Sequence, residues 1–118
     1  LEHKTRYLQI AFNYEARMVR QILPSIVHSS RILIEAGTPY LKREGMNGIR
    51  MIRRLWPGHV VADIKTVDGA LGEVDMVHAA GATAATVLGN SPAETLDLFI
   101  ERASRKPAAR SLTARTLW

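Results

Sequence analysis

The sequence predicts an α/β protein built as half of a (β/α)8 TIM-type barrel, with four consecutive β/α units and parallel strands. Three observations predict this fold. Apolar runs of strand length alternate four times with segments of helical periodicity along the 118 residues. The apolar runs are nearly continuous, which is typical of strands buried on both faces. Polar and charged residues follow the ends of these runs, where a β/α barrel builds its functional site.

The first unit begins with an apolar run at residues 7–12, which Asn13 ends. Residues 15–26 follow with apolar side chains at helical spacing, which predicts the first helix. Because proline cannot continue a helix, we expect Pro24 to end or kink it.

The second and third units repeat this order. Residues 31–36 form an apolar run, and residues 45–55 carry apolar side chains on one helical face with arginines opposite. Residues 59–65 form the third run, and residues 68–80 the third helix. Gly81 stands where a C-terminal glycine cap is expected.

The fourth unit comprises a strand at residues 83–88 and a helix that runs to about residue 104. Residues 91–94, Ser-Pro-Ala-Glu, have the pattern of a capping box with proline at the first helical position. We therefore assign residues 1–106 to the half barrel. Residues 107–118 match neither a clean strand nor an amphipathic helix, so they form either a basic flexible tail or a docking arm that uses Leu112, Leu117 and Trp118.

The composition excludes several classes of protein. Hydrophobic residues make up 47% of the chain, which is enough for a folded core, and the absence of cysteine excludes disulfides and thiolate metal sites. No apolar run reaches the roughly 20 residues that span a membrane, so a cytoplasmic location is expected. The net charge of +5 comes from one helix face and the tail, which argues against a nucleic-acid partner and suits an anionic ligand such as a sugar phosphate.

Polar residues gather where the strands end, and in a β/α barrel these ends meet on one face. The candidates for this face are Asn13, Glu35, Thr38, Asp63, Lys65, Asp68, Gly89 and Asn90. His28 and His59 precede strands and belong at the opposite end, and His78 lies on a helix. The sequence therefore places no histidine well for catalysis.

The Asp63-x-Lys65-x-x-Asp68 string carries the clearest chemical signal. Residues two apart on a strand point to the same side, so the Lys65 ammonium would lie beside the Asp63 carboxylate, where it could neutralise an enolate or transfer a proton. Glu35 and Asp63 on adjacent strands could share a hard cation such as Mg²⁺. Structural ion pairs at strand ends remain the alternative. Gly89 and Asn90 could bind phosphate through their amides, but the capping box explains these residues without a ligand and is the preferred interpretation.

The sequence around these candidate residues resembles that of the orotidine-monophosphate decarboxylase superfamily. The most similar branch is 3-hexulose-6-phosphate synthase, followed by keto-gulonate-phosphate decarboxylase. The resemblance covers roughly residues 7–104. It rests mainly on Ala62-Asp63-Ile64-Lys65-Thr66-Val67-Asp68 together with Glu35-Ala36-Gly37-Thr38-Pro39 upstream.

The resemblance implies a lyase with Mg²⁺-dependent aldol chemistry, in which ribulose 5-phosphate forms an enediolate that adds to formaldehyde. It implies that Glu35 and Asp63 hold the metal and substrate hydroxyls, with Asn13, Thr38, Gly89 and Asn90 around the substrate. Lys65 would stabilise the enediolate or transfer a proton. Asp68 would support Lys65 or reach across a dimer interface.

Two departures from the family pattern affect this expectation. The first strand ends in Asn13 where the family usually has aspartate, and four units are half of an eight-stranded barrel. We expect a homodimer that completes the barrel by pairing the fourth strand of one copy with the first strand of the other. The alternatives are a dimer packed face to face, as the resemblance to the family implies, or a larger protein partner that supplies the second half. The alternative function is a non-catalytic half-barrel subunit or regulator.

Overall fold

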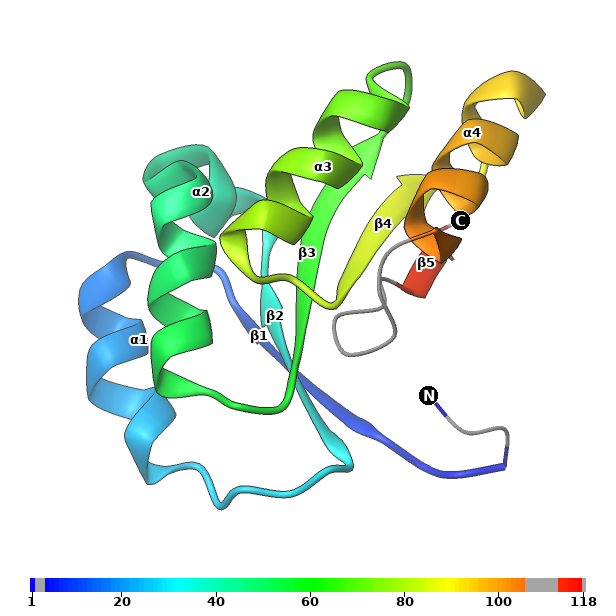
Figure 1. The fold of residues 1–118 in the computed structure, drawn as a ribbon. Helices are drawn as coiled ribbons and strands as arrows, with labels where there is room; N and C mark the ends of the chain where they lie inside the picture. Colours follow the sequence, from blue (N-terminus) through cyan, green and yellow to red (C-terminus); the bar gives the residue numbers. More distant parts are fainter. Residues whose placement is uncertain (2–3, 106–112, 118) are drawn as a thin grey trace.

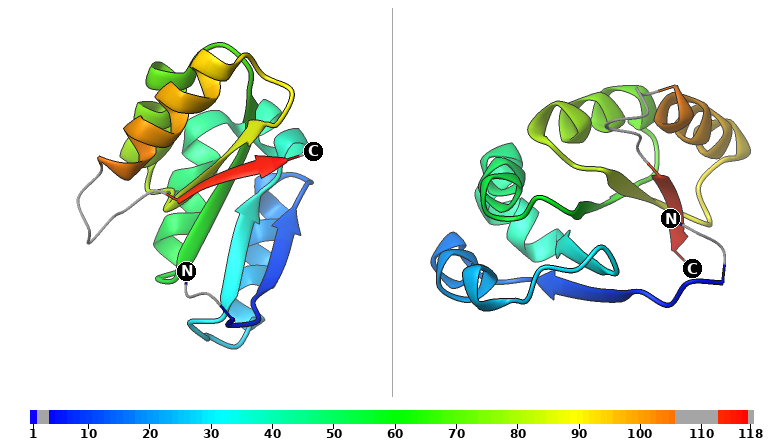
Figure 2. Two further views of the ribbon diagram at one scale, coloured as in Figure 1. Left: turned by 90° about the vertical axis from the view of Figure 1, so that its right-hand side faces the viewer. Right: turned by 60° about the horizontal axis from the view of Figure 1, so that its bottom comes forward.

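Five parallel strands form a single curved sheet in the order β1-β2-β3-β4-β5 in the computed structural model, which describes residues 1, 4–105 and 113–117 (Figure 1). The strands are β1 (Leu8–Phe12), β2 (Ile32–Ala36), β3 (His59–Thr66), β4 (Ala84–Leu88) and β5 (Thr113–Leu117). The connecting helices are α1 (Ala16–Ile22), α2 (Thr38–Leu55), α3 (Ala70–Ala80) and α4 (Ala93–Ser104). Figure 2 shows these helices along the outer side of the curved sheet. The four predicted β/α units are therefore confirmed.

The main hydrophobic core lies between the outer face of the sheet and the helices. Ile34, Val60 and Val87 contribute the strand side of this core and are fully buried. The helices contribute, among others, Val19, Ile49, Ile52, Val74, Val77 and Phe99. Burial of this apolar surface is the main stabilisation that holds the helices on the sheet.

The inner face of the sheet carries a smaller hydrophobic cluster than the outer face, and polar residues continue it. Leu33, Val61 and Ala84 form a separate cluster there, against which Tyr7 packs. Glu35 and Asp63 follow on the same faces of β2 and β3, nearer the C-terminal ends of these strands. The polar part of the inner face therefore lies at the end where barrel enzymes place their sites.

The sequence prediction was accurate for the end of the first helix and incomplete for the second. Pro24 ends α1 as expected, since it lies in a 3₁₀ turn at Leu23–Ser25. The second helix begins at Thr38 rather than near Gly45, with Pro39 in its first turn. Gly45 has φ +56° and interrupts the helix, so the prediction found only the part after the break.

The predicted C-terminal cap of α3 is confirmed, whereas the predicted N-terminal cap of α4 is wrong. Gly81 has φ +107° and ends α3 in the left-handed conformation that glycine adopts without strain. The capping box at Ser91 is wrong, because Pro92 is the N-cap of α4 and no side chain caps it. The Ser91 hydroxyl instead donates to the Thr66 carbonyl oxygen at 3.1 Å and ties the start of α4 to the end of β3. None of the helices in the described ranges is long and apolar enough to cross a bilayer.

The C-terminal segment contains a fifth strand that the sequence analysis did not predict. Thr113–Leu117 pairs in parallel with Ala84–Leu88 in unbroken register. Its backbone thus occupies the edge of β4 that we had assigned to a second copy of the chain. Leu112 and Trp118, two of the proposed docking residues, lie outside the described residues.

Candidate functional site

The C-terminal ends of β1 to β4 bring the predicted site residues to one edge of the sheet. Glu35 and Asp63 lie on strands, and Lys65 lies at the end of β3. The remaining candidates follow strands or begin a helix: Asn13, Thr38, Asp68, Gly89 and Asn90. Among all these candidates, Asp63, Lys65 and Thr38 contact one another directly through their side chains.

Lys65 and Asp63 form an ion pair between Nζ and Oδ2. Lys65 Nζ also donates to Thr38 Oγ1 at 2.6 Å. The Thr38 hydroxyl lies 2.9 Å from Asp63 Oδ2 and 2.6 Å from the Asp63 carbonyl oxygen, so its single proton is shared between these two acceptors. The predicted pairing of Asp63 with Lys65 on one side of β3 is therefore present, and Thr38 at the start of α2 completes a three-residue cluster.

The backbone at Lys65 is unusual for a strand residue. Its φ is +51°, in the left-handed region that costs a non-glycine residue about 1–2 kcal/mol. The register of β3 against β4 also shifts here, between the pairs Ala62–Ala85 and Thr66–Val87. Such irregularities redirect side chains and are frequent beside functional sites. The chain accepts local strain at the residue whose ammonium reaches Asp63.

The cluster keeps the Asp63 carboxylate ionised although it is buried. Burial alone would raise the pKa of Asp63, but hydrogen bonds from Lys65, Thr86 and Thr38, together with the Lys65 charge, outweigh it and lower the pKa below its ordinary value. Asp63 is only 7% exposed, whereas the Lys65 side chain is 40% exposed. A fixed anion thus orients a cation that remains accessible from outside.

Glu35 and Asp63 differ as possible metal ligands. Glu35 accepts a hydrogen bond from Gln9 on β1, whereas both oxygens of Asp63 already accept hydrogen bonds. Within the described part of the chain, no three acidic or histidine side chains come together as a metal site. Mg²⁺ takes only one or two protein carboxylates and completes its shell with water and substrate oxygens, so Glu35 is the more available ligand of the two.

The other candidates lie around the cluster without joining it. Asp68 is exposed after β3, and among the described residues no ion pair links it to Lys65. Asn13 packs so closely on Gly37 that a Cβ at position 37 would lie 2.0 Å from Asn13 Oδ1. Gly89 and Asn90 form the turn after β4. Glycine at position 37 is therefore required for the close approach of the β1 and β2 ends.

Sequence reasoning missed two polar residues of this region. Thr86 lies inside the apolar run of β4 and donates to Asp63 Oδ1 at 2.8 Å. Gln9 lies inside the run of β1 and donates to Glu35. Thr86 is buried, and a buried polar group needs a partner, so this rule would have singled it out without naming Asp63. Gln9 is exposed on β1, so no comparable signal pointed to it.

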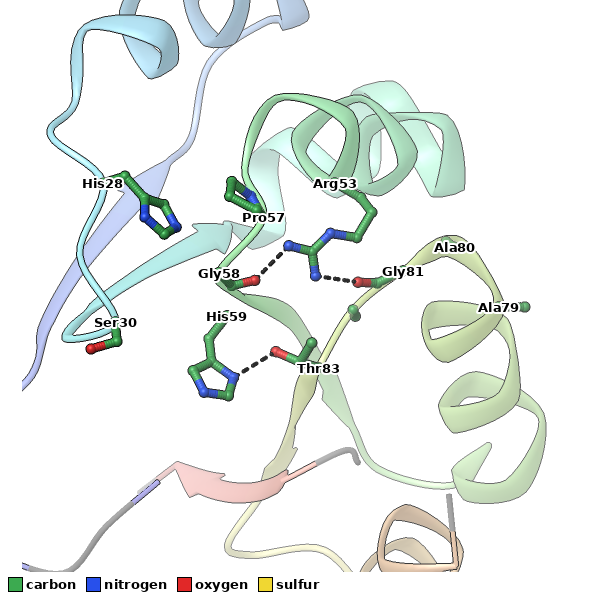
Figure 3. Close-up of a pocket in the computed structure, with 11 residues that line it drawn as sticks. His28, Ser30, Arg53, Pro57, Gly58, His59, Ala79, Ala80, Gly81 and Thr83 are labelled. Carbon is green, nitrogen blue, oxygen red and sulfur yellow. Dashed lines mark hydrogen bonds between the residues drawn. The ribbon is translucent and has the colours of Figure 1, made fainter. Parts of the chain in front are cut away.

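A cavity of about 620 Å³ lies at the opposite end of the strands (Figure 3). His28 and His59 line it, as expected for residues that precede strands. Figure 3 shows the Arg53 guanidinium between the Gly58 and Gly81 carbonyl oxygens, and it also donates to Trp56. Arg53 thus caps the ends of α2 and α3 with a cation, a stabilising arrangement at helix C-termini. We therefore interpret the residues around this cavity, Arg53 above all, as stabilising the fold.

Four parallel β/α units with a charged cluster at the C-terminal strand ends define the chain as part of a β/α-barrel protein. Comparison with known sequences gives the family. The chain belongs to the Orotidine 5'-phosphate decarboxylase / HUMPS family, whose sequence profile matches residues 6–116.

The curated relatives are longer than this chain. A bifunctional enzyme Fae/Hps of Methanothrix thermoacetophila is 40% identical over 101 residues, which are 84% of this chain and 26% of that protein. The bifunctional enzyme Fae/Hps of Methanosarcina barkeri is 41% identical over 101 residues, again 84% of this chain and 26% of that protein. The chain thus spans about a quarter of the length of these relatives.

Solved structures match in the same partial way. The 3-hexulose-6-phosphate synthase of Salmonella typhimurium superposes with a TM-score of 0.80 and 32% identity, over 92% of this chain and 51% of that one. The 3-keto-L-gulonate-6-phosphate decarboxylase of Vibrio cholerae gives a TM-score of 0.83 at 24% identity, over 98% and 53%. The second match shows the shared fold alone. The described chain corresponds to about half of such a barrel.

Proposed function

We propose that this chain carries one half of an aldehyde-lyase site of the 3-hexulose-6-phosphate synthase type. The observation that carries the proposal is the Lys65 ammonium held by Asp63 and Thr38 at the C-terminal end of β3. The relative of this name from Salmonella typhimurium supports the choice of reaction class. The substrates we propose are ribulose 5-phosphate and formaldehyde.

The proposed reaction has two steps. A general base of the completed barrel first takes a proton from C1 of ribulose 5-phosphate, which leaves an enediolate. The enediolate carbon then forms a bond to the formaldehyde carbon. The carbonyl oxygen of formaldehyde becomes an alkoxide and takes up a proton. Negative charge therefore develops on oxygen in both steps.

The Lys65 ammonium suits the stabilisation of that charge. An ammonium has three N–H donors, and the contacts to Asp63 and Thr38 use two of them. The third donor can bind an enediolate oxygen, and the Asp63 carboxylate holds the ammonium in place. We assign Asn13, Glu35, Thr38, Gly89 and Asn90 to substrate binding, and Asp68 to support of Lys65, either from the same chain or across an interface.

We further propose that Mg²⁺ takes part, with Glu35 and Asp63 as its protein ligands. When bound, the cation would polarise the substrate carbonyl and lower the energy of the enediolate. Glu35 offers the more available carboxylate, since Asp63 is already engaged by Lys65, Thr38 and Thr86.

We propose that a second half barrel completes the site, supplied by another copy of the chain or by a larger partner. β1 is an edge strand whose Leu8 is 58% exposed, and such an edge invites further strand pairing. Since β5 covers β4, the edges open to a partner are those of β1 and β5. The same exposed edge favours the second candidate function, a non-catalytic half-barrel subunit that binds a larger complex.

The first experiment is to measure the mass of the purified chain in solution and to assay that species with ribulose 5-phosphate, formaldehyde and Mg²⁺. We expect turnover that Asp63→Ala and Lys65→Ala abolish. Arg54→Met, on an exposed face of α2, is the control and should keep wild-type turnover. An inert wild-type chain in every oligomeric state would contradict the enzyme proposal and favour the binding subunit.

A further inference from the structure

The ladder between β3 and β4 opens beside the site. Ala62 pairs with Ala85 and Thr66 with Val87, so the segment from Asp63 to Lys65 faces Thr86 alone on β4. The β3 backbone there has lost the regular sequence of inter-strand hydrogen bonds, and Lys65 adopts its left-handed φ of +51° within this segment. Something other than the ladder must hold this backbone.

The side chain of Thr86 makes the missing connections. Its Oγ1 accepts a hydrogen bond from the Lys65 backbone N–H at 3.0 Å and donates to Asp63 Oδ1 at 2.8 Å. A hydroxyl has one proton and two lone pairs, so a single group can serve both contacts at once. Thr86 is 3% exposed, so water does not compete freely for these bonds.

A second threonine, just before the start of β4, makes a comparable contact to the β3 backbone away from the site. Thr83 Oγ1 accepts a hydrogen bond from the Val60 backbone N–H at 3.0 Å, at the other end of the β3–β4 ladder. It touches neither Asp63 nor Lys65. Thr83 and Thr86 therefore make matching threonine-to-backbone bonds, and only the bond of Thr86 lies within the site.

We infer that Thr86 is a positioning residue, which fixes the Lys65 backbone and the Asp63 carboxylate relative to each other through one hydroxyl. The hydroxyl holds Lys65 in its left-handed conformation, and this conformation directs the ammonium to Asp63. The inference about geometry stands on these contacts, and its consequence for turnover rests on the proposed function.

The test compares three variants of the full chain by NMR. Thr86→Val keeps the shape of the side chain and removes the hydroxyl, Thr86→Ser keeps the hydroxyl, and Thr83→Val removes the matching bond away from the site. We expect Thr86→Val to lower the hydrogen-exchange protection of the Lys65 amide about five- to tenfold, the change that corresponds to one hydrogen bond. Its Lys65 Cα and Cβ shifts should also move from left-handed toward extended values. Thr86→Ser and Thr83→Val should leave Lys65 as in the wild type.

Lys65 protection and shifts that are unchanged in Thr86→Val would overturn the inference, and so would an equal loss in Thr83→Val. In turnover, Thr86→Val should lower kcat roughly ten- to a hundredfold with little change in KM, and Thr86→Ser should restore it. An inactive wild-type chain would count against the proposed function alone, because the exchange comparison decides the inference without any turnover.

Discussion

Gly48 and Tyr40 meet inside α2, across the break at Gly45. The Tyr40 hydroxyl donates to the Gly48 carbonyl oxygen at 3.0 Å, and a Cβ at position 48 would lie 2.6 Å from Tyr40 Cε1. Both residues are buried, and Tyr40 is 0% exposed. The tyrosine ring thus occupies the space that any side chain at position 48 would need.

Gly48→Ala should therefore destabilise the protein by about 1–3 kcal/mol, the usual cost of overpacking a core. Gly72→Ala is the matched control, since position 72 is exposed on α3 and a Cβ there meets nothing within 4 Å. That change should stabilise by about 0.5–1 kcal/mol, because alanine favours the helix. Urea unfolding of both variants gives the comparison, and equal signs for the two would contradict the packing argument.

Arg53 and Arg54 are neighbours in sequence with different roles. Arg53 donates to three backbone carbonyl oxygens, whereas Arg54 is exposed on α2. Arg53→Met should lower the free energy of unfolding by about 1–3 kcal/mol, because it leaves half-buried carbonyl groups without a donor. Arg54→Met should change it by less than about 0.5 kcal/mol. Chemical unfolding of the two variants at neutral pH measures the difference, and similar losses in both would disprove the capping role.

The alternation of apolar runs and helical segments was sufficient to predict the four β/α units, because β2, β3 and β4 are largely buried and each helix buries one face. The ion pair between Asp63 and Lys65 is present as predicted. The period-2 rule does not explain it, because the strand is irregular at Lys65, where φ is +51° and the register to β4 shifts. The four units thus follow from local pattern, whereas this pairing also depends on contacts between strands.

The errors arose where distant contacts decided the local structure. Ser91 has the sequence of a helix cap, but its hydroxyl binds the end of β3 instead. Residues 38–44 lack a clear apolar face and are separated from the rest of α2 by Gly45. The left-handed Lys65 and its contact with Thr86 depend on the register of two strands, which the composition of either strand does not reveal.

His59 should make the protein sensitive to mild acid. Burial lowers the pKa of His59, and nearby positive charge, including Arg53, lowers it further. The unfolded chain therefore binds a proton near pH 6.5 before the folded chain does, so the free energy of unfolding should fall as the pH drops through this range. In His59→Gln this part of the pH dependence should disappear.

Urea unfolding at pH 7.5 and 5.5 tests this sign. We expect the wild type to lose more stability than His59→Gln between the two values. A wild type that gains stability relative to the variant at pH 5.5 would show that the folded state favours the charged imidazole instead.

The Asp63–Lys65 pair should act in a lower pH range and with its own control. The pKa of Asp63 is lowered in the folded state, so its contribution to stability is fully present above the ordinary aspartate pKa, about 3.9, and is lost as the pH falls toward the folded value.

Lys65→Met removes both the hydrogen bond and the charge that lower the pKa of Asp63 and leaves the burial that raises it. The variant should be about 1–3 kcal/mol less stable at pH 7 and should lose less additional stability between pH 5 and 3. Asp97→Asn changes an exposed carboxylate on α4, away from the cluster, and should keep the wild-type dependence. Guanidinium unfolding at pH 7, 5 and 3 separates these outcomes, and a Lys65→Met profile parallel to that of the wild type would mean that Lys65 does not hold the Asp63 carboxylate ionised.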